Sequence, residues 1–463
     1  MHNSARRAGI LLPVTALPAC EADEAAEGGL LGARASAFVD FLADAGQSLW
    51  QVLPIGPVGV SLSPYQSSSA FAGNPAWISP ARENLRGESD YEIFLKENEF
   101  WLEDFALFTV LKERLGGTPL QDWPAEYRCP AREALGKLRR READAIEAIK
   151  RAQYCFFAEW RELKAHANLR GISIVGDLPF YPSEDSAEFW LRRDLFETDK
   201  EGRPSVVAGV PPDAFSADGQ IWNNPVYAWE RRGKEVLAFW LSRLTQAQRL
   251  YDVVRIDHFR AFADYYTIPI KTAGRRTKAK CKGGVWKPGP GRVFLDAVRK
   301  NLPGLRVIAE DLGDLSGAAQ TLCEVSGYPG MKVLQFAFEG GSENAYLPHN
   351  IEENSVVYTG THDNDTARGW ANSLSETEAA PALRYFGLQR RRELPAALRR
   401  AALMCRAETA ILPLQDWLGL GRSARINTPS TMGGRNWKWQ TPAGVLTRER
   451  AETIREETER YGR

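Results

Sequence analysis

The sequence predicts an α/β chain that closes into a (β/α)8 TIM barrel with large inserted subdomains. Eight short apolar or β-branched runs, each bounded by turn-forming residues, recur along the 463 residues. Helix-like segments lie between most of these runs, and the runs are apolar at successive positions, as in strands buried on both faces. Alternating strands and helices indicate a parallel sheet, and eight repeats favour a closed barrel over an open doubly wound sheet.

The predicted strands, in chain order, are residues 9–14, 48–54, 172–179, 253–259, 306–312, 332–338, 355–361 and 410–416. The clearest helical patterns are residues 33–46, before the second strand, and residues 381–410, before the eighth. No internal repeat, low-complexity tract or Pro/Gly/Ser-rich linker divides the chain. We therefore expect residues 1–463 to form a single barrel domain.

A barrel of this kind needs about 250 residues, so about 200 residues must lie in insertions. The spacing of the strands predicts the larger insertion at residues 55–170, between the second and third strands. Helical stretches at 100–117 and 134–171 fall in this region, and much of the latter is expected to form the regular helix before the third strand. A second insertion is expected at residues 180–250, between the third and fourth strands, and contains DGQIWNNPVYAW.

The charge balance predicts a neutral partner. Lys plus Arg and Asp plus Glu each total 59, so the chain has no net field that would attract nucleic acid or an anionic membrane. The basic stretch at 271–284 could hold phosphate, but a solvated loop is the simpler interpretation. No run reaches the roughly 18 apolar residues of a membrane span.

The six cysteines predict a reducing compartment, the cytoplasm. They are scattered without CxxC spacing, so neither a zinc site nor a disulfide framework is indicated. Arg6 and Arg7, followed by an apolar run that ends at Cys20, imitate a signal peptide, and export is the alternative. Because Pro13 and Pro18 interrupt that run, we interpret its beginning as the first buried strand.

Three carboxylates, Asp257, Glu310 and Asp363, each lie where an apolar run stops and a polar loop begins. A single Asp in that position is more often a turn residue or a helix N-cap than a catalytic group. Three such residues in one chain change this balance, because His258 and His362 flank two of them and the chain has five histidines in all. The pattern predicts an enzyme with acid/base and nucleophilic chemistry at one rim of the barrel.

Several sequence blocks carry a family resemblance. They are VLPIGPVG, SPYQSSSAFAGNP, GDLPFY, DSAEFW, VVAGVPPDAFSADGQIWNNPVYAW, VVRIDHFRAF, VIAEDLG, GYPGMKVLQFAF, YTGTHDNDTARGW and LPLQDWLGLG. These blocks follow the order that they have in the amylomaltases, 4-α-glucanotransferases also called disproportionating enzymes. From about residue 9 to residue 440, the chain resembles that family. The resemblance implies an α-amylase-type barrel without a C-terminal β-domain, which transfers α-1,4-glucan segments to the 4-hydroxyl of an acceptor with retention. A retaining α-glucan hydrolase and a glucan-binding protein without catalysis are the alternatives.

The resemblance assigns the three carboxylates to roles. Asp257 would be the nucleophile, Glu310 the general acid/base and Asp363 the carboxylate that stabilises the transition state. Retaining glycosidases hold the nucleophile and the acid/base about 5 to 5.5 Å apart, a spacing that neighbouring barrel strands can provide. We expect burial and the charge of Asp257 to raise the pKa of Glu310, and Arg255, on the same strand face as Asp257, to hold that carboxylate ionised.

A glucan cleft needs aromatic platforms beside short polar side chains, because pyranose rings present apolar faces ringed by hydroxyls. The residues that resemble the family's substrate contacts are Ser63, Tyr65, Asp177, Gln220, Trp222, Arg255 and His362. The expected partners are maltooligosaccharides, starch or glycogen fragments, and glucose. No metal and no cofactor is expected.

Some positions depart from the family pattern. Ser61 and Leu62 replace Gly-Asp before SPYQ, residues 13–16 replace His-Pro-Thr-Ser, and Glu184 replaces a His or Tyr. The acidic run at 21–29 replaces a Gly-rich turn, and TMGGRNWKW near the end is also altered. None of these changes affects the three carboxylates. The changes therefore bear on distal subsites and on chain-length preference.

Other motifs lack the context that they need. GLGRSA (419–424) fits the dinucleotide pattern GxGxxA, but Pro429 argues against the long helix that must follow. DNDTARG (363–369) begins like a calcium loop and lacks the glycine at its sixth position. HExxH, Walker A and GxSxG elements are absent from the sequence, which removes metalloprotease, kinase-like and serine-hydrolase interpretations.

Overall fold

Eight parallel strands form a closed barrel in the computed structural model, which describes residues 6–19, 29–79, 88–212, 218–270, 281, 283–313 and 317–463. The order around the barrel is β1-β12-β11-β10-β9-β6-β3-β2, so each strand pairs with its neighbours along the chain and the last closes on the first. The strands are β1 Arg7–Leu11, β2 Leu49–Gln51, β3 Ser173–Leu178, β6 Val253–Ile256, β9 Val307–Ala309, β10 Gly330–Val333, β11 Ser355–Tyr358 and β12 Thr409–Pro413. The predicted (β/α)8 barrel is confirmed.

All eight predicted strands exist, but most end earlier than the sequence predicts. β1 stops at Leu11, two residues before Pro13, which has no N–H to donate to a neighbouring strand. In the region predicted as 332–338, β10 ends at Val333 and a 3-10 helix takes over at Leu334–Phe336. The apolar runs therefore include the first residues of the loops at the carboxyl rim.

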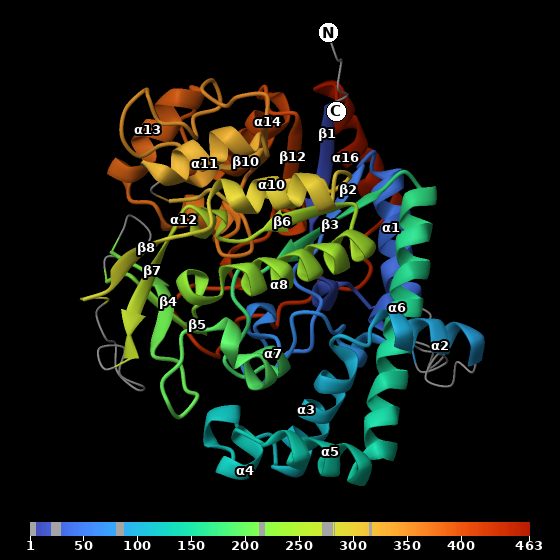
Figure 1. The fold of residues 1–463 in the computed structure, drawn as a ribbon. Helices are drawn as coiled ribbons and strands as arrows, with labels where there is room; N and C mark the ends of the chain where they lie inside the picture. Colours follow the sequence, from blue (N-terminus) through green and yellow to red (C-terminus); the bar gives the residue numbers. More distant parts are fainter. Residues whose placement is uncertain are drawn as a thin grey trace.

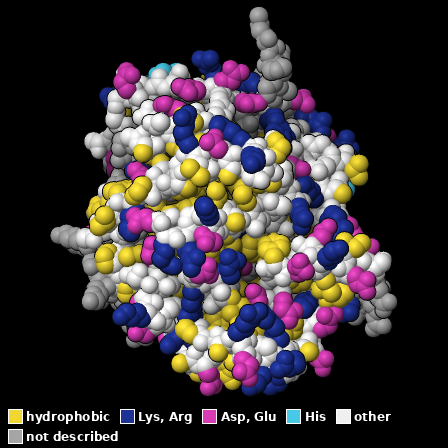
Figure 2. Space-filling model, in the orientation of Figure 1, with side chains coloured by type: hydrophobic (Ala, Val, Ile, Leu, Met, Phe, Trp, Pro, Cys, Tyr) yellow, Lys and Arg dark blue, Asp and Glu magenta, His cyan; other side chains and the backbone are white. Residues whose placement is uncertain are grey.

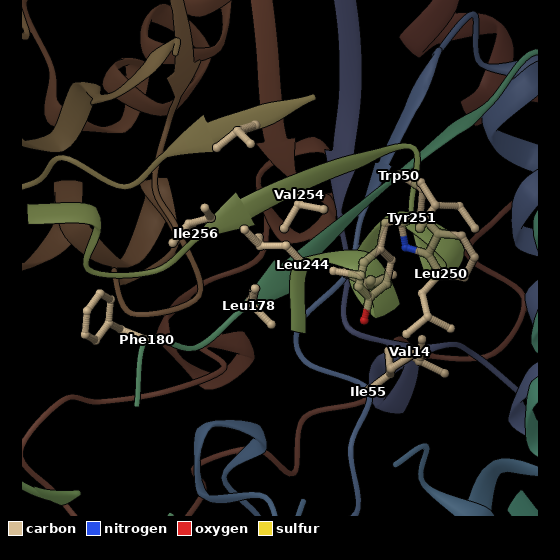
Figure 3. Packing of buried hydrophobic residues seen from close by; sticks show 14 of the residues in the cluster. Val14, Trp50, Ile55, Leu178, Phe180, Leu244, Leu250, Tyr251, Val254 and Ile256 are labelled. Carbon is tan, nitrogen blue, oxygen red and sulfur yellow. The ribbon is translucent and has the colours of Figure 1, made fainter. Parts of the chain in front are cut away.

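Side chains alternate between the inside and the outside of the barrel. The interior cluster takes at least one apolar residue from each strand: Leu11, Leu49, Val175, Val253, Ile308, Met331, Val333, Val356, Tyr358 and Ile411. Their neighbours, such as Trp50 and Val254, point outward under the helices. Figure 3 shows Leu244, Leu250 and Tyr251 beside Trp50, Leu178 and Val254 in this outer layer. This double burial explains why the strands are apolar at successive positions.

Helices cover the barrel on its outer face (Figure 1). They are α1 Ala35–Asp44, α6 Ala143–Leu169, α8 Trp229–Leu250, α10 Arg292–Asn301, α11 Ala318–Ser326, α12 Ala367–Ser373, α13 Glu376–Phe386, α14 Leu394–Met404, α15 Leu414–Trp417 and α16 Arg448–Arg460. The helix predicted at 33–46 is α1, and the pattern at 381–410 resolves into the end of α13 and all of α14. Residues 334–354, between β10 and β11, are all described and contain no α-helix.

The long connection between β2 and β3 carries additional helices. They are α2 Glu88–Glu97, α3 Leu102–Arg114, α4 Ala125–Arg128 and α5 Arg132–Arg141. Figure 1 shows α3, α4 and α5 at the end of the molecule away from α10 and α11. As predicted, the last part of this connection is the regular barrel helix, because α6 leads directly to β3. The boundaries 55–170 and 180–250 for the two insertions stay predictions.

A second sheet, which the sequence analysis did not predict, lies outside the barrel. Its antiparallel strands are ordered β5-β4-β7-β8 and comprise β4 Val206–Val210, β5 Gln220–Pro225, β7 Asp264–Pro269 and β8 Val285–Pro288. The first two come from the connection between β3 and β6, and the other two from the connection between β6 and β9. One side of the barrel rim is thereby flanked by a sheet whose strands come from two connections.

Other predictions concern the ends of the chain and its surface. Residues 414–463, which follow β12 and are all described, form helices and loops without a further strand. Within the described ranges, no helix is long and apolar enough to cross a membrane. Figure 2 shows basic and acidic side chains interspersed over one face. Cys20, most of the acidic run 21–29 and most of the basic stretch 271–284 lie outside the described residues.

Candidate active site

Backbone hydrogen bonds extend beyond the ends of β6 and β9 and fix two of the carboxylates. Asp257 directly follows β6, and its N–H donates to the carbonyl of Leu178 at 3.1 Å. Glu310 directly follows β9, its N–H donates to the carbonyl of Ile256 at 3.0 Å, and its own carbonyl accepts from Phe259. Because β6 and β9 pair in the barrel, the two side chains start from adjacent, rigid positions at the carboxyl rim.

Glu310 lies in an environment that favours its protonated form. Its Oε2 accepts from the backbone N–H of His258 at 2.7 Å, and its Oε1 accepts from the N–H of Leu312 at 2.9 Å. Burial raises the pKa of Glu310 to about 7, and the negative charge of Asp257 adds to the rise. The predicted direction and its causes are confirmed, and Glu310 is partly protonated near neutral pH.

Asp257 pairs with Arg255, as the shared strand face predicts. The Arg255 Nη2 lies 3.0 Å from Oδ1 of Asp257. Burial nevertheless raises the pKa of Asp257 to about 6, because desolvation outweighs the opposing effect of Arg255. The expectation that Arg255 holds Asp257 ionised is therefore only partly right, because Arg255 lowers the pKa of Asp257 but burial raises it by more. The two carboxyls thus differ in their partners, since a guanidinium faces Asp257 whereas two backbone N–H groups hold Glu310.

Arg255 also links Asp257 to Asp177 and Tyr65. Its Nη1 donates to both carboxylate oxygens of Asp177, each at 2.7 Å, and the Tyr65 hydroxyl donates to Oδ2 of Asp177 at 2.7 Å. Asp177 is 2% exposed, so its carboxylate is committed to these two protein partners. A direct contact between Asp177 and a sugar stays a prediction.

The loop after β11 carries His362 and Asp363. The side-chain amide of Asn427 donates to Oδ1 of Asp363 at 2.6 Å, and Nε2 of His362 lies 3.4 Å from the same oxygen. Tyr65 stacks on the His362 ring with a centroid distance of 5.2 Å and an angle of 18°. The stack connects the loop after β2 with the loop after β11, two strands that are separated by β1 and β12 in the strand order.

Three residues that meet this loop were missed from the sequence. They are Asn427, Arg425, whose Nη2 donates to the carbonyl of Asp363 at 2.6 Å, and Trp437, whose ring lies 6.0 Å from Tyr65 and 5.9 Å from His362. All three follow the GxGxxA motif, which forms only a 3-10 turn at Arg422–Ala424. For Arg425 and Asn427 the available signal was the polar segment RINTPST, which served only as an argument against a cofactor site, and Trp437 lies in TMGGRNWKW, which was noted only as a departure from the family pattern.

Trp222 lies at the same rim, on β5 of the second sheet. Its ring meets the His258 ring edge-on at 4.8 Å, and its Nε1 donates to Oε1 of Gln220 at 3.1 Å. Trp222 is thus brought against His258, the residue after Asp257.

Ser63 directly precedes the 3-10 helix Pro64–Gln66 that carries Tyr65, and Leu62 before it has a φ of 58°. The contacts of Ser63 and Gln220 with substrate stay predictions.

The acidic loop after β11 uses its side chains for protein contacts. Asn364 accepts hydrogen bonds from the N–H and the hydroxyl of Thr361, and Asp365 accepts from Nε of Arg422 at 2.6 Å. Within the part of the chain that the structure describes, no three His, Cys, Asp or Glu side chains are grouped to hold a metal ion.

Comparison with known proteins identifies the family. A family model described as 4-alpha-glucanotransferase matches residues 12–89 and 81–446. The chain belongs to the 4-alpha-glucanotransferase family. The 4-alpha-glucanotransferase of Thermus thermophilus is 39% identical over 98% of this chain and 99% of its own length, and that of Clostridium butyricum is 37% identical over 94% and 97%.

Solved structures agree with this 4-alpha-glucanotransferase assignment. Amylomaltase from Streptococcus agalactiae, solved in complex with acarbose, has a TM-score of 0.90, 33% identity and 99% coverage of both chains. Amylomaltase from Corynebacterium glutamicum has a TM-score of 0.73 at 15% identity, covering 99% of this chain and 75% of its own, and shows the shared fold alone. The family predicted from the sequence blocks is confirmed.

The raised pKa of Glu310 predicts a pH-dependent cost to stability. Between its ordinary value of 4.5 and its folded value of about 7, the folded state holds a proton that the unfolded state has lost, so stability falls as pH rises through this window. Glu310→Gln removes the titrating group. The Tm of the variant minus the Tm of the unmodified protein should therefore be larger at pH 8 than at pH 5.

Thermal unfolding of both proteins at the two pH values measures this difference. Glu113→Gln, at an exposed helical position, is the control and should show the same Tm difference at both. A Glu310→Gln difference that does not change with pH would contradict the raised pKa.

Proposed function

We propose that this rim transfers α-1,4-glucan segments by retaining double displacement, with Asp257 as nucleophile, Glu310 as general acid/base and Asp363 as the stabilising carboxylate. The main support is the pair Asp257 and Glu310 at the ends of adjacent strands, where Arg255 faces Asp257 and two backbone N–H groups hold Glu310. A retaining mechanism needs one ionised and one protonated carboxyl group at the start. Membership of the 4-alpha-glucanotransferase family supports the same chemistry.

In the first step, Asp257 attacks the anomeric carbon while Glu310 gives its proton to the glycosidic oxygen. The bond to the leaving glucan breaks, and a glycosyl ester forms on Asp257. Both Glu310 oxygens accept a backbone N–H bond and keep a second lone pair, so the carboxyl group can hold a proton without losing its position. In the second step, Glu310 takes the proton of an acceptor 4-hydroxyl, whose oxygen attacks the ester and releases Asp257.

The residues around the three carboxylates would support these steps in different ways. Burial lowers the pKa of His258 to about 3, so this residue is neutral and adds no positive charge beside Glu310. Trp222, half-buried against His258, offers a ring for an apolar sugar face. Tyr65 and His362 form a stacked wall near Asp363. Ser63, Gln220 and Arg255 complete the proposed binding set.

We also propose that the enzyme works in the cytoplasm. No disulfide joins the five cysteines that the structure describes, which fits a reducing compartment. Relatives from rice and Arabidopsis carry names that assign them to chloroplasts or amyloplasts, so compartments differ within the family. Detection in a periplasmic or culture fraction of the source cells would contradict a cytoplasmic site.

Maltotriose distinguishes transfer from hydrolysis. A transferase conserves the number of glycosidic bonds, so the products should be glucose and maltooligosaccharides longer than the donor, with the total of reducing ends unchanged. Chromatography of the products and a reducing-end assay on the same samples measure both quantities. Reducing ends that rise in step with substrate loss, without longer products, would favour the hydrolase.

Substitutions separate the proposed roles of the carboxylates. Glu310→Ala should nearly abolish maltotriose turnover, because a sugar leaving group needs a proton. The same variant should still form a glycosyl-enzyme from a maltosyl fluoride donor, since fluoride leaves with little protonation. Asp257→Ala should form no adduct with either donor, and Asp363→Asn should be severely slowed with both.

Intact-protein mass spectrometry after exposure to the fluoride donor measures the adducts. Glu113→Ala, at an exposed helical position, serves as the matched control and should behave as the unmodified protein. An adduct on the Asp257 variant, or rescue of the Asp363 variant by fluoride as complete as that of the Glu310 variant, would show that the roles are assigned wrongly.

A further inference from the structure

One buried carboxylate holds both ends of the loop that carries Asp363. Asp416 lies in α15, directly after β12, and is 4% exposed. Its Oδ2 accepts from the hydroxyl of Thr359 at 2.5 Å, and its Oδ1 accepts from the backbone N–H of Ala367 at 2.7 Å. Thr359 is the first residue after β11, and Ala367 is the first residue of α12. The loop between them, residues 360–366, is therefore closed at its base by a side chain from the short helix that follows the neighbouring strand β12.

Other contacts hold the middle of the same loop. The side-chain amide of Gln335 donates to the carbonyl of Asp365 at 2.8 Å, and Arg422 pairs with the Asp365 carboxylate. Gly369 makes room for this arrangement, since a Cβ at that position would lie 2.1 Å from Oδ1 of Asp365. With the base closed by Asp416, the path of the chain through His362 and Asp363 is fixed relative to β11 and β12.

We propose that Asp416 is a positioning residue for Asp363, which keeps that carboxylate at the distance from the reacting sugar that the transition state requires. The inference rests on the role proposed above for Asp363. Catalytic groups must be held within about 0.5 Å of their productive geometry, and an error of about 1 Å can cost about 10²-fold in rate. Asp363 is 46% exposed, so burial does not hold its side chain, and its position depends on the Asn427 hydrogen bond and on the path of its loop.

The two hydrogen bonds, rather than the negative charge, carry the proposed function of Asp416. An asparagine at this position can still accept from the Ala367 N–H and can donate to the Thr359 hydroxyl oxygen. An alanine can do neither and leaves two buried donors without a partner. Asp416→Asn is therefore the conservative variant, Asp416→Ala removes both bonds, and Thr359→Val removes one.

Glu159 provides a matched control for the general effect of losing such a carboxylate. It is 4% exposed on α6, and it accepts from the backbone N–H of Ser79 at 3.0 Å and from the Ser79 hydroxyl. Like Asp416, it thus binds one N–H and one hydroxyl from a loop, but that loop carries none of the catalytic carboxylates. Glu159→Ala should lower Tm and leave kcat of the folded protein within about twofold.

The first experiment compares kcat and KM for maltotriose in the full-length variants, with Tm measured on the same samples. Asp416→Ala should lower kcat about 10²-fold with KM nearly unchanged, Thr359→Val should lower it less, and Asp416→Asn should retain most activity. If Asp416→Ala does not fold, the other two variants still test the inference, because kcat should be lower in Thr359→Val than in Asp416→Asn. A kcat loss in Asp416→Ala no larger than that in Glu159→Ala, or a change confined to KM, overturns it.

The second experiment asks whether Asp416 acts through Asp363. An Asp363→Asn protein no longer has a carboxylate on this loop for Asp416 to position. In that background, Asp416→Ala should therefore cause little further loss of kcat. Equal factors in both backgrounds overturn the positioning role while leaving the proposed function in place. If Asp363→Asn alone keeps normal kcat, the role proposed for Asp363 is wrong, and the inference about Asp416 is overturned with it.

Discussion

The charge balance inside the barrel depends on Arg255. Its guanidinium is nearly inaccessible to solvent and lies between two carboxylates, Asp177 on β3 and Asp257 at the end of β6. The Asp177 side chain is fully enclosed, and burying its charge without a partner would cost several kcal/mol. Because one cation meets both carboxylates, and Tyr65 donates a further hydrogen bond to Asp177, the rim can keep Asp257 ionised above an apolar interior.

The same arrangement leaves Glu310 outside the cation's direct reach. Its oxygens are satisfied by two backbone N–H groups, which fix its position but compensate its charge less than a guanidinium would. His258, whose N–H donates one of these bonds, has a φ of 51°, a left-handed conformation that is uncommon for a residue with a side chain. Two carboxyls on neighbouring strands thus receive different partners, and this difference supports the separate roles proposed for them.

The sequence predicts those parts of the fold and the site that have a local cause. Strands buried on both faces are apolar at successive positions, so all eight were found, and Asp257 and Glu310 stand out because each directly follows a strand. The second sheet escaped prediction because β5 reads QIWNNP and β8 reads VWKP, with no clean alternation of apolar residues. The pairing of Arg255 with Asp177 and that of Asn427 with Asp363 also escaped, because each joins residues more than 60 positions apart. Only the closed barrel brings such pairs together.

The order of the strands has a consequence for how activity emerges during folding. Asp257 and Glu310 follow β6 and β9, whereas Asp363 follows β11 and depends on groups after β12, and β12 pairs with β1 when the barrel closes. No contiguous half of the barrel contains the whole triad with its supports. A half-barrel intermediate with native strands would therefore be inert, and the regain of activity on refolding would follow closure of the ring rather than the earlier appearance of helices.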